Sequence, residues 1–201
     1  MKAFLGIVVL ILAVSSTHAQ INSVEETTIY GYHRRIGIPE AARIKRLEEE
    51  IIRSGNLGRI VGGSATDISQ VPYQAGLIMA FAEGNSICGG SLISNTRVVT
   101  AAHCYSESDM VAKSFTVVLG SNFIFYGGVR ITTTNVAVHP NWDPWSTVND
   151  VAVLRISRVS FSNVIQPINL PSGTDISNNF SGATALASGF GYIGEGMIRF
   201  I

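Results

Sequence analysis

Two short runs of residues hold the side chains best suited to acid–base chemistry. The run at 99–104 reads Val-Thr-Ala-Ala-His-Cys and carries His103, and the run at 149–154 reads Asn-Asp-Val-Ala-Val-Leu and carries Asp150. An imidazole changes its charge near neutral pH, so it can take a proton from a hydroxyl group and make it nucleophilic. Taken alone, a histidine beside a cysteine is usually structural, and an aspartate in this setting is usually a turn residue before a strand.

Two further runs complete a recognisable pattern. Residues 59–63 read Arg-Ile-Val-Gly-Gly, and residues 88–93 read Cys-Gly-Gly-Ser-Leu-Ile. All four runs, in this order behind an N-terminal export signal, strongly resemble the chymotrypsin/trypsin family of serine proteases. The resemblance extends from Arg59 to about Gly191, and Val-Pro-Tyr-Gln-Ala-Gly at 71–76 is similar to insect gut and haemolymph members.

The resemblance gives both residues a role. In this family a histidine is the general base that activates a serine, and a buried aspartate holds the imidazole in the correct tautomer. His103 and Asp150 match these two positions. The family hydrolyses peptide bonds of protein or peptide substrates through an acyl-enzyme, and the resemblance implies no metal ion and no cofactor.

The nucleophile of the family is missing from these residues. It lies in a Gly-Asp-Ser-Gly-Gly-Pro run, and no such run occurs in the 201 residues. Ser91 belongs to the first-barrel motif, and Ser188 matches the opening strand of the second barrel. In the family the oxyanion hole and specificity pocket also belong to the second barrel, so we expect the 201-residue chain to have essentially no peptidase activity.

The bond between Arg59 and Ile60 resembles the activation cleavage site of the family. An activating trypsin-like protease would free an α-amino group at Ile60, which in the family pairs with an aspartate beside the nucleophile. Arg34-Arg35, Lys45-Arg46 and Arg53 are alternative processing points.

Short apolar runs separated by Gly, Asn, Asp and Pro predict an all-β domain after residue 60. Strands of this length and spacing are typical of an antiparallel sandwich or barrel. The resemblance sharpens this to the trypsin-like double antiparallel β-barrel, with the first barrel (60–165) complete and the second (166–201) largely missing. The expected strands are 73–81, 87–93, 97–101, 115–119, 129–138 and 151–156, and residues 184–188 could begin another.

Charged side chains change in density near residue 60. Residues 20–59 hold seven Lys/Arg and six Asp/Glu, whereas the 142 residues of 60–201 hold six and eight. We interpret 20–59 as an activation propeptide, solvated and outside the protease domain of 60–201. Within it, residues 39–52 favour a short, marginal helix with charges facing water, because a proline suits the first turn and Gly55 suits the end. The histidine at position 33 looks unremarkable.

The first 19 residues are typical of a signal peptide. Lys2 precedes an apolar run that is too short for a membrane anchor, and small residues follow it. Secretion into an oxidising, extracellular compartment would let the two cysteines, Cys88 and Cys104, form a disulfide that encloses 15 residues. Two free buried thiols are the alternative. After signal removal we expect no membrane partner and, with a net charge of zero, no nucleic-acid partner.

The leading interpretation is therefore a secreted serine endopeptidase zymogen. The alternative is a secreted, non-catalytic protease homologue with a binding or regulatory role. The presence of both His103 and Asp150 argues against that alternative, because a binding module has no chemical need for them.

Overall fold

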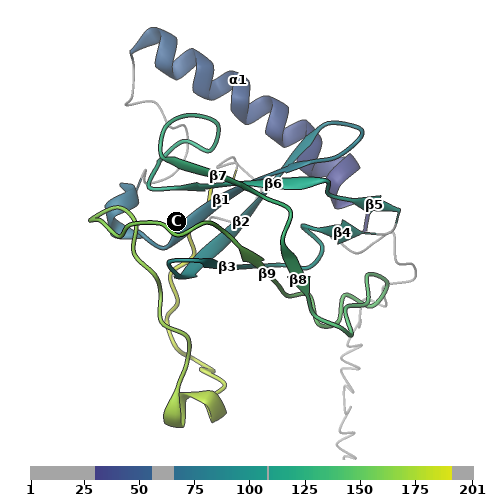
Figure 1. The fold of residues 1–201 in the computed structure, drawn as a ribbon, viewed down its shortest axis with the longest axis vertical. Coiled ribbons are helices and arrows are strands. Elements are labelled where there is room, and N and C mark those ends of the chain that lie inside the picture. Colours follow the sequence, from purple (N-terminus) through teal and green to yellow (C-terminus); the bar gives the residue numbers. More distant parts are fainter. Residues whose placement is uncertain (1–29, 56–65, 108, 192–201) are drawn as a thin grey trace, which may run out of the picture.

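The computed structural model describes residues 30–55, 66–107 and 109–191, and Figure 1 shows their arrangement. A π-helical turn (His33–Gly37) leads into one long helix, and nine strands follow. These elements are α1 (Ile38–Ser54), β1 (Gln74–Ala80), β2 (Asn85–Ser94), β3 (Arg97–Thr100), β4 (Ser106–Glu107), β5 (Met110–Val111), β6 (Ser114–Leu119), β7 (Val129–Thr133), β8 (Val136–Val138) and β9 (Ala152–Arg155). Among these described residues, no helix is both long and apolar enough to cross a bilayer.

Seven strands form one antiparallel sheet in the order β7-β6-β1-β2-β3-β9-β8. The two edge strands, β7 and β8, follow one another in the chain and are separated only by residues 134 and 135. So short a connection requires the two edges to lie close together, which means that the sheet curls into a barrel (Figure 1). The predicted all-β fold with a complete first barrel is confirmed.

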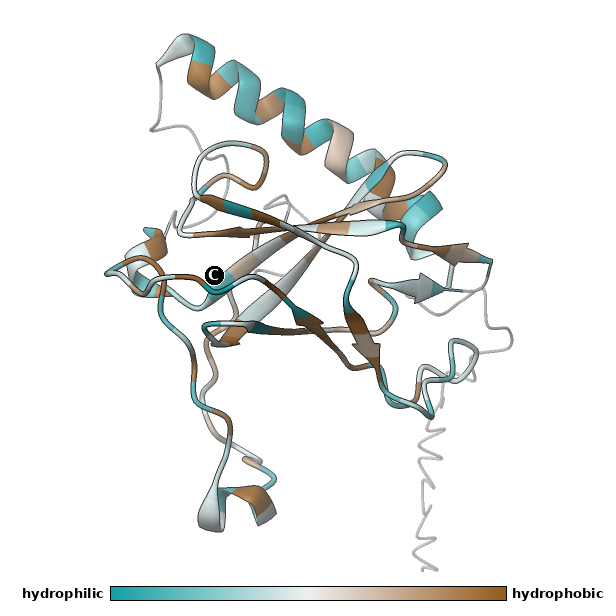
Figure 2. Ribbon diagram, viewed as in Figure 1, coloured by the Kyte–Doolittle hydropathy of each residue, from teal (hydrophilic) through white to brown (hydrophobic). Residues whose placement is uncertain are grey.

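The barrel encloses an apolar core. Leu77 of β1, Leu92 of β2, Phe115 and Val117 of β6 and Leu154 of β9 have no exposed surface. Hydrophobic residues follow the strands throughout the barrel (Figure 2). Burial of this apolar surface is the main favourable contribution to folding.

The predicted strands are found, with two differences. The expected strand at 129–138 is two strands, because β7 pairs with β6 whereas β8 pairs with β9 across the barrel closure. The two-residue strands β4 and β5 pair only with each other and were not predicted. No strand forms at residues 184–188, and residues 157–191 contain only a 3-10 turn (Gly173–Ser177) as regular structure.

The prediction of a solvated extension is wrong for its described part. Helix α1 packs on the barrel, where Ala41 and Ile44 are buried in one cluster with barrel residues such as Ile78 and Ile124. Ile51 of the same helix is also buried. Figure 2 shows hydrophobic and hydrophilic residues alternating along α1, as expected of a helix with one face against a core. The helix ends where predicted, since Gly55 takes the left-handed conformation (φ 66°) that favours glycine.

Candidate active site

Two neighbouring strands bring His103 and Asp150 together. Strands β3 and β9 are antiparallel, and Thr100 at the end of β3 pairs with Ala152 at the start of β9. The residue that follows the first strand and the residue that precedes the second therefore lie at the same end of the sheet. His103 Nδ1 and one carboxylate oxygen of Asp150 are 2.8 Å apart, and the backbone N–H of His103 donates to the other oxygen at 2.8 Å.

The contact between Nδ1 and the carboxylate indicates the tautomer of neutral His103. A carboxylate can only accept, so the proton on the ring must be on Nδ1, and Nε2 keeps a free lone pair. Both side chains remain partly accessible, with 17% of His103 and 19% of Asp150 exposed. An imidazole in this state can accept a proton at Nε2 while the carboxylate stabilises the resulting cation.

A tight turn places Asp150 in front of His103. Asn149 has a left-handed backbone (φ 61°), a conformation that asparagine tolerates better than most residues. Its side-chain amide donates to the carbonyl of Asn141 at 2.8 Å. The sequence indicated a turn here but did not predict this anchoring role of Asn149.

The predicted disulfide between Cys88 and Cys104 is confirmed. It joins β2 to the residue after His103, and Sγ of Cys104 lies 3.7 Å from Nε2 of His103. Sulfur and nitrogen atoms of Cys88, His103 and Cys104 cluster within 4.8 Å. Because both sulfurs are bonded to each other, neither offers the thiolate that a metal ion would need.

An open cleft lies beside Asp150. It is lined by residues of β1, β2 and β3 and by Leu186, Ala187 and Ser188 of the C-terminal part. The hydroxyl of Ser188 donates to Oε1 of Gln74 at 2.6 Å, which holds this part against β1. Ser91 lies on β2, a strand as expected, and it also lines this cleft.

The interpretation of His33 as unremarkable is wrong, because this residue is completely buried against the site. One ring nitrogen, Nε2, contacts the backbone carbonyl of His103 at 2.8 Å, and Nδ1 contacts the hydroxyl of Ser86 at 2.9 Å. The ring also packs on Phe81, with centroids 4.3 Å apart. Burial, which the hydrogen bond to His103 only partly offsets, lowers the pKa of His33 from 6.5 to about 4.

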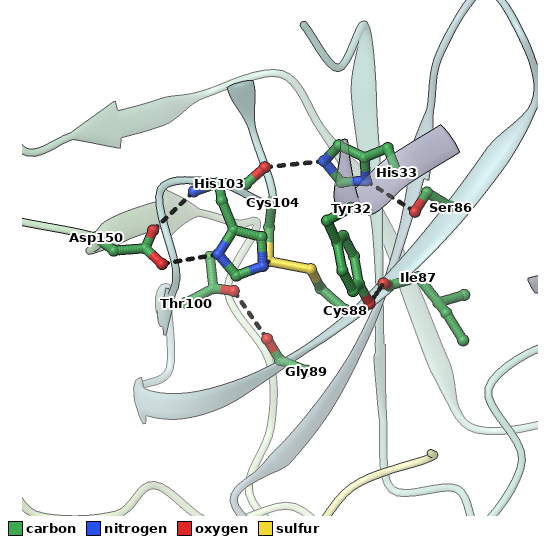
Figure 3. Close-up of a disulfide and its surroundings, with 10 residues drawn as sticks. All are labelled: Tyr32, His33, Ser86, Ile87, Cys88, Gly89, Thr100, His103, Cys104 and Asp150. Atoms are coloured by element: carbon green, nitrogen blue, oxygen red, sulfur yellow. Dashed lines mark hydrogen bonds and ion pairs between the residues drawn. A yellow bond between two sulfur atoms is a disulfide. The ribbon is translucent and has the colours of Figure 1, made fainter. Parts of the chain in front are cut away.

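Tyr32 lies directly on the imidazole of His103. The two rings meet edge to face with centroids 5.3 Å apart, and the Tyr32 hydroxyl donates to the carbonyl of Ile87 at 3.0 Å (Figure 3). Burial, followed by the negative charges of Glu107 and Glu40, raises the pKa of this hydroxyl above its usual value. The tyrosine therefore stays neutral and donates.

Glu107 of β4 contacts the backbone of both Tyr32 and His33. Only 4% of it is exposed, and its Oε1 accepts a hydrogen bond from the backbone N–H of His33 at 3.4 Å. Within the described part of the chain, its Oε2 has no hydrogen-bond partner. Burial raises the pKa of this carboxyl, and hydrogen bonds from the backbone of His33 and Tyr32 oppose the rise.

The sequence contained a signal that α1 packs against the barrel. The buried residues of α1 recur at positions 41, 44, 48 and 51, which is the spacing of one helix face. The expected activation bond between Arg59 and Ile60 and the expected signal peptide at 1–19 lie outside the described residues.

Comparison with known proteins agrees with this fold. Residues 60–198 match the protein family described as Trypsin. Collagenase of Hypoderma lineatum is 38% identical over 135 residues, which cover 67% of this chain and 50% of that protein. Trypsin beta of Drosophila erecta is 40% identical over 135 residues, with the same coverage of both chains. The solved structure of HL collagenase superimposes with a TM-score of 0.55 at 37% identity, and the match covers 60% of this chain and 51% of that one.

The fold and the His–Asp pair define half of a double-barrel protein of the serine protease class. The chain belongs to the trypsin family. It spans about half the length of the curated relatives that it matches, and those relatives come from insects.

Proposed function

We propose that this chain is part of a secreted serine endopeptidase that is made as a zymogen. In this proposal, residues 1–19 direct export, residues 20–59 are an activation propeptide, and a trypsin-like protease cuts between Arg59 and Ile60. The support comes from the trypsin-family match and from the insect trypsins among its relatives. The substrates are proteins or peptides.

The observation that carries the proposal is the 2.8 Å contact between Nδ1 of His103 and the carboxylate of Asp150. With Nδ1–H held by Asp150, the free Nε2 can take the proton of a serine hydroxyl and then give it to the leaving amine. The serine attacks the carbonyl carbon, the C–N bond breaks, and water later hydrolyses the acyl-enzyme. In this proposal the 201 residues contribute the base and the carboxylate, and the family's nucleophile motif does not occur among them.

A labelling experiment tests the missing nucleophile. The 201-residue chain, cut after Arg59, is treated with a fluorophosphonate probe that acylates only activated serines. We expect no labelling and no hydrolysis of peptide substrates. Covalent labelling at Ser91 or Ser188 would show that the nucleophile is present after all.

A chimera tests the roles of His103 and Asp150. Residues 1–191 are joined to the C-terminal half of the H. lineatum collagenase, which supplies a second barrel. After the cut at Arg59, Asp150→Asn should lower kcat/KM by about 10⁴ at neutral pH, the loss known for this triad, and His103→Ala should remove a similar amount. His139→Ala, at another histidine of the barrel, is the matched control and should change the rate less than about twofold. A chimera that cleaves peptides equally well without His103 would contradict the proposal.

A further inference from the structure

Residues 30–55 are bound to the barrel around the very residue that carries the proposed chemistry. Tyr32 covers the edge of the His103 imidazole, and His33 binds the carbonyl of the same residue. Figure 3 shows both neighbours converging on His103 from the side opposite to Asp150. The catalytic histidine is thus held between its aspartate and the N-terminal segment.

The segment is attached by buried polar contacts at both ends. At its start, His33 bridges Ser86 and the His103 backbone while Glu107 receives the N–H of His33. At the far end, the carboxylate of Glu48, 4% exposed, accepts the backbone N–H groups of Ile124 and Phe125 at 2.8 Å each. Arg34 adds exposed ion pairs with Glu83 and Asp109.

Residues 30–55 pack closely against the surface of the barrel. Gly37 is buried, and an added Cβ would collide with Oγ of Ser86 and lie 3.1 Å from the Tyr32 ring. Apolar residues of α1 fill the space over Ile78, Ile87 and Ile124. Charged groups, apolar side chains and shape all match, which distinguishes a specific binding surface from incidental contact.

Tyr32 occupies space that the proposed reaction needs. Nε2 of His103 has to reach the nucleophile and then the leaving amine of the substrate, so that half of the substrate passes beside the imidazole. Tyr32 lies against the side of the His103 imidazole that is next to the disulfide, and its hydroxyl donates to the backbone carbonyl of Ile87. A substrate strand there would have to displace the tyrosine.

We infer that residues 30–55 are a built-in inhibitor that stays bound to the first barrel after the chain is cut at Arg59, with Tyr32 blocking the leaving-group side of His103. The inference rests on the proposed function for the role of His103. None of the contacts above needs a covalent link between the segment and the barrel. Activation then needs two steps, the cut and the removal of the segment.

Accessibility of His103 tests the blocking contact. The full chain is treated with diethyl pyrocarbonate, and modification of His103 is measured by mass spectrometry relative to His139. Tyr32→Ala should raise the relative rate about tenfold, since it removes the covering ring. Tyr32→Phe keeps the ring. Tyr126→Ala removes a tyrosine whose hydroxyl donates to Glu49 of the same segment, so both variants should stay within about twofold of wild type. Equal rates for Tyr32→Ala and wild type would overturn the inference.

A variant at Gly37 repeats the test without altering Tyr32. Gly37→Ala should push the start of the segment off Ser86 and expose His103 in the same way. The exposed residue before it gives the control Ile36→Ala, which should have no effect. If Tyr32→Ala does not fold, the Gly37 pair decides the question.

A cut variant tests whether the segment stays bound. Asn56→Ile with Leu57→Glu turns residues 56–59 into Ile-Glu-Gly-Arg, so a restriction protease can cut after Arg59 alone. At neutral pH the cut segment should co-elute with the barrel in gel filtration, and Glu48→Lys should release it. A segment that leaves the wild-type barrel on cutting overturns the inference.

The chimera separates this inference from the proposed function. Cut chimera with the segment bound should hydrolyse peptides at least about tenfold more slowly than cut chimera carrying Tyr32→Ala. Equal rates with the segment still bound would overturn the inhibitory role and leave the proposed function standing. A chimera that is inactive in both forms, although His103 is exposed by Tyr32→Ala, would count against the proposed function instead.

Discussion

Nε2 of His33 lies 2.8 Å from the backbone carbonyl oxygen of His103, yet the two histidines have opposite tautomers. Asp150 can only accept, so His103 carries its proton on Nδ1. The His103 carbonyl can also only accept, so His33 carries its proton on Nε2, and its Nδ1 accepts from the Ser86 hydroxyl. The first histidine keeps a free lone pair for chemistry, whereas both nitrogens of the second are used to hold the segment.

Acid should weaken the contribution of His33 to stability. Its pKa is about 4 in the folded protein against 6.5 unperturbed, so the neutral ring stabilises the fold above pH 6.5 and this contribution is lost as the pH falls from 6.5 towards 4. Burial raises the pKa of the facing Glu107, which acts in the opposite direction because protonation relieves its buried charge.

The comparison of wild type with His33→Gln isolates this effect. The difference in free energy of unfolding should shrink by about 2 kcal/mol between pH 7 and pH 5, measured by urea titration. Ser160→Ala, at an exposed serine, serves as the control. A difference that stays constant with pH would show that His33 titrates normally in the folded protein.

At the level of single elements, α1 depends on one buried carboxylate. Glu48→Ala leaves the N–H groups of Ile124 and Phe125 without their acceptor, which should destabilise the fold by about 2–3 kcal/mol. Glu50→Ala, at an exposed position of the same helix, should change stability by less than about 0.5 kcal/mol. Thermal unfolding and amide exchange at residues 124 and 125 measure both, and equal effects of the two substitutions would contradict the assigned role.

The disulfide stabilises the element that carries His103. It closes a loop of 15 residues between Cys88 and Cys104, so replacing both cysteines with alanine should lower the free energy of unfolding by about 3 kcal/mol. The shift in urea midpoint checks this value. An unchanged midpoint would mean that neighbouring packing alone holds β2 against the His103 loop.

Most elements were predictable from sequence because their patterns are local. The helix was expected at 39–52 and is α1 (Ile38–Ser54). The flanking residues of His103 and Asp150 led to the expectation that these two side chains pair, and they are in contact. The docking of α1 was not predicted because a glutamate stands in its buried face, so the face reads as polar until Ile124 and Phe125 supply partners. Strands β4 and β5 were missed because two residues are too few to show a period.

For the whole molecule, apolar side chains remain uncovered on the part that follows β9. Leu170, Ile176 and Leu186 are 60%, 75% and 60% exposed, and Leu186 also lines the cleft beside Asp150. Exposed apolar side chains of this size favour association in water.

The 201-residue chain should therefore self-associate at micromolar concentrations. Sedimentation velocity should detect oligomers, and Leu186→Glu should shift the distribution towards monomer because it places a charge in the cleft. Ser181→Glu, at an exposed polar position, controls for added charge alone. A wild-type chain that remains monomeric throughout would contradict the prediction.

The two-ended attachment of α1 also has a consequence for the order in which the chain acquires its structure. Synthesis runs from the N-terminus, so residues 30–55 emerge first, but the groups that secure them lie at positions 86, 103, 107 and 124. A 17-residue helix is marginal by itself in water. We therefore expect the earliest-made part of the described chain to pack only after the barrel has formed, over an imidazole that is already in place.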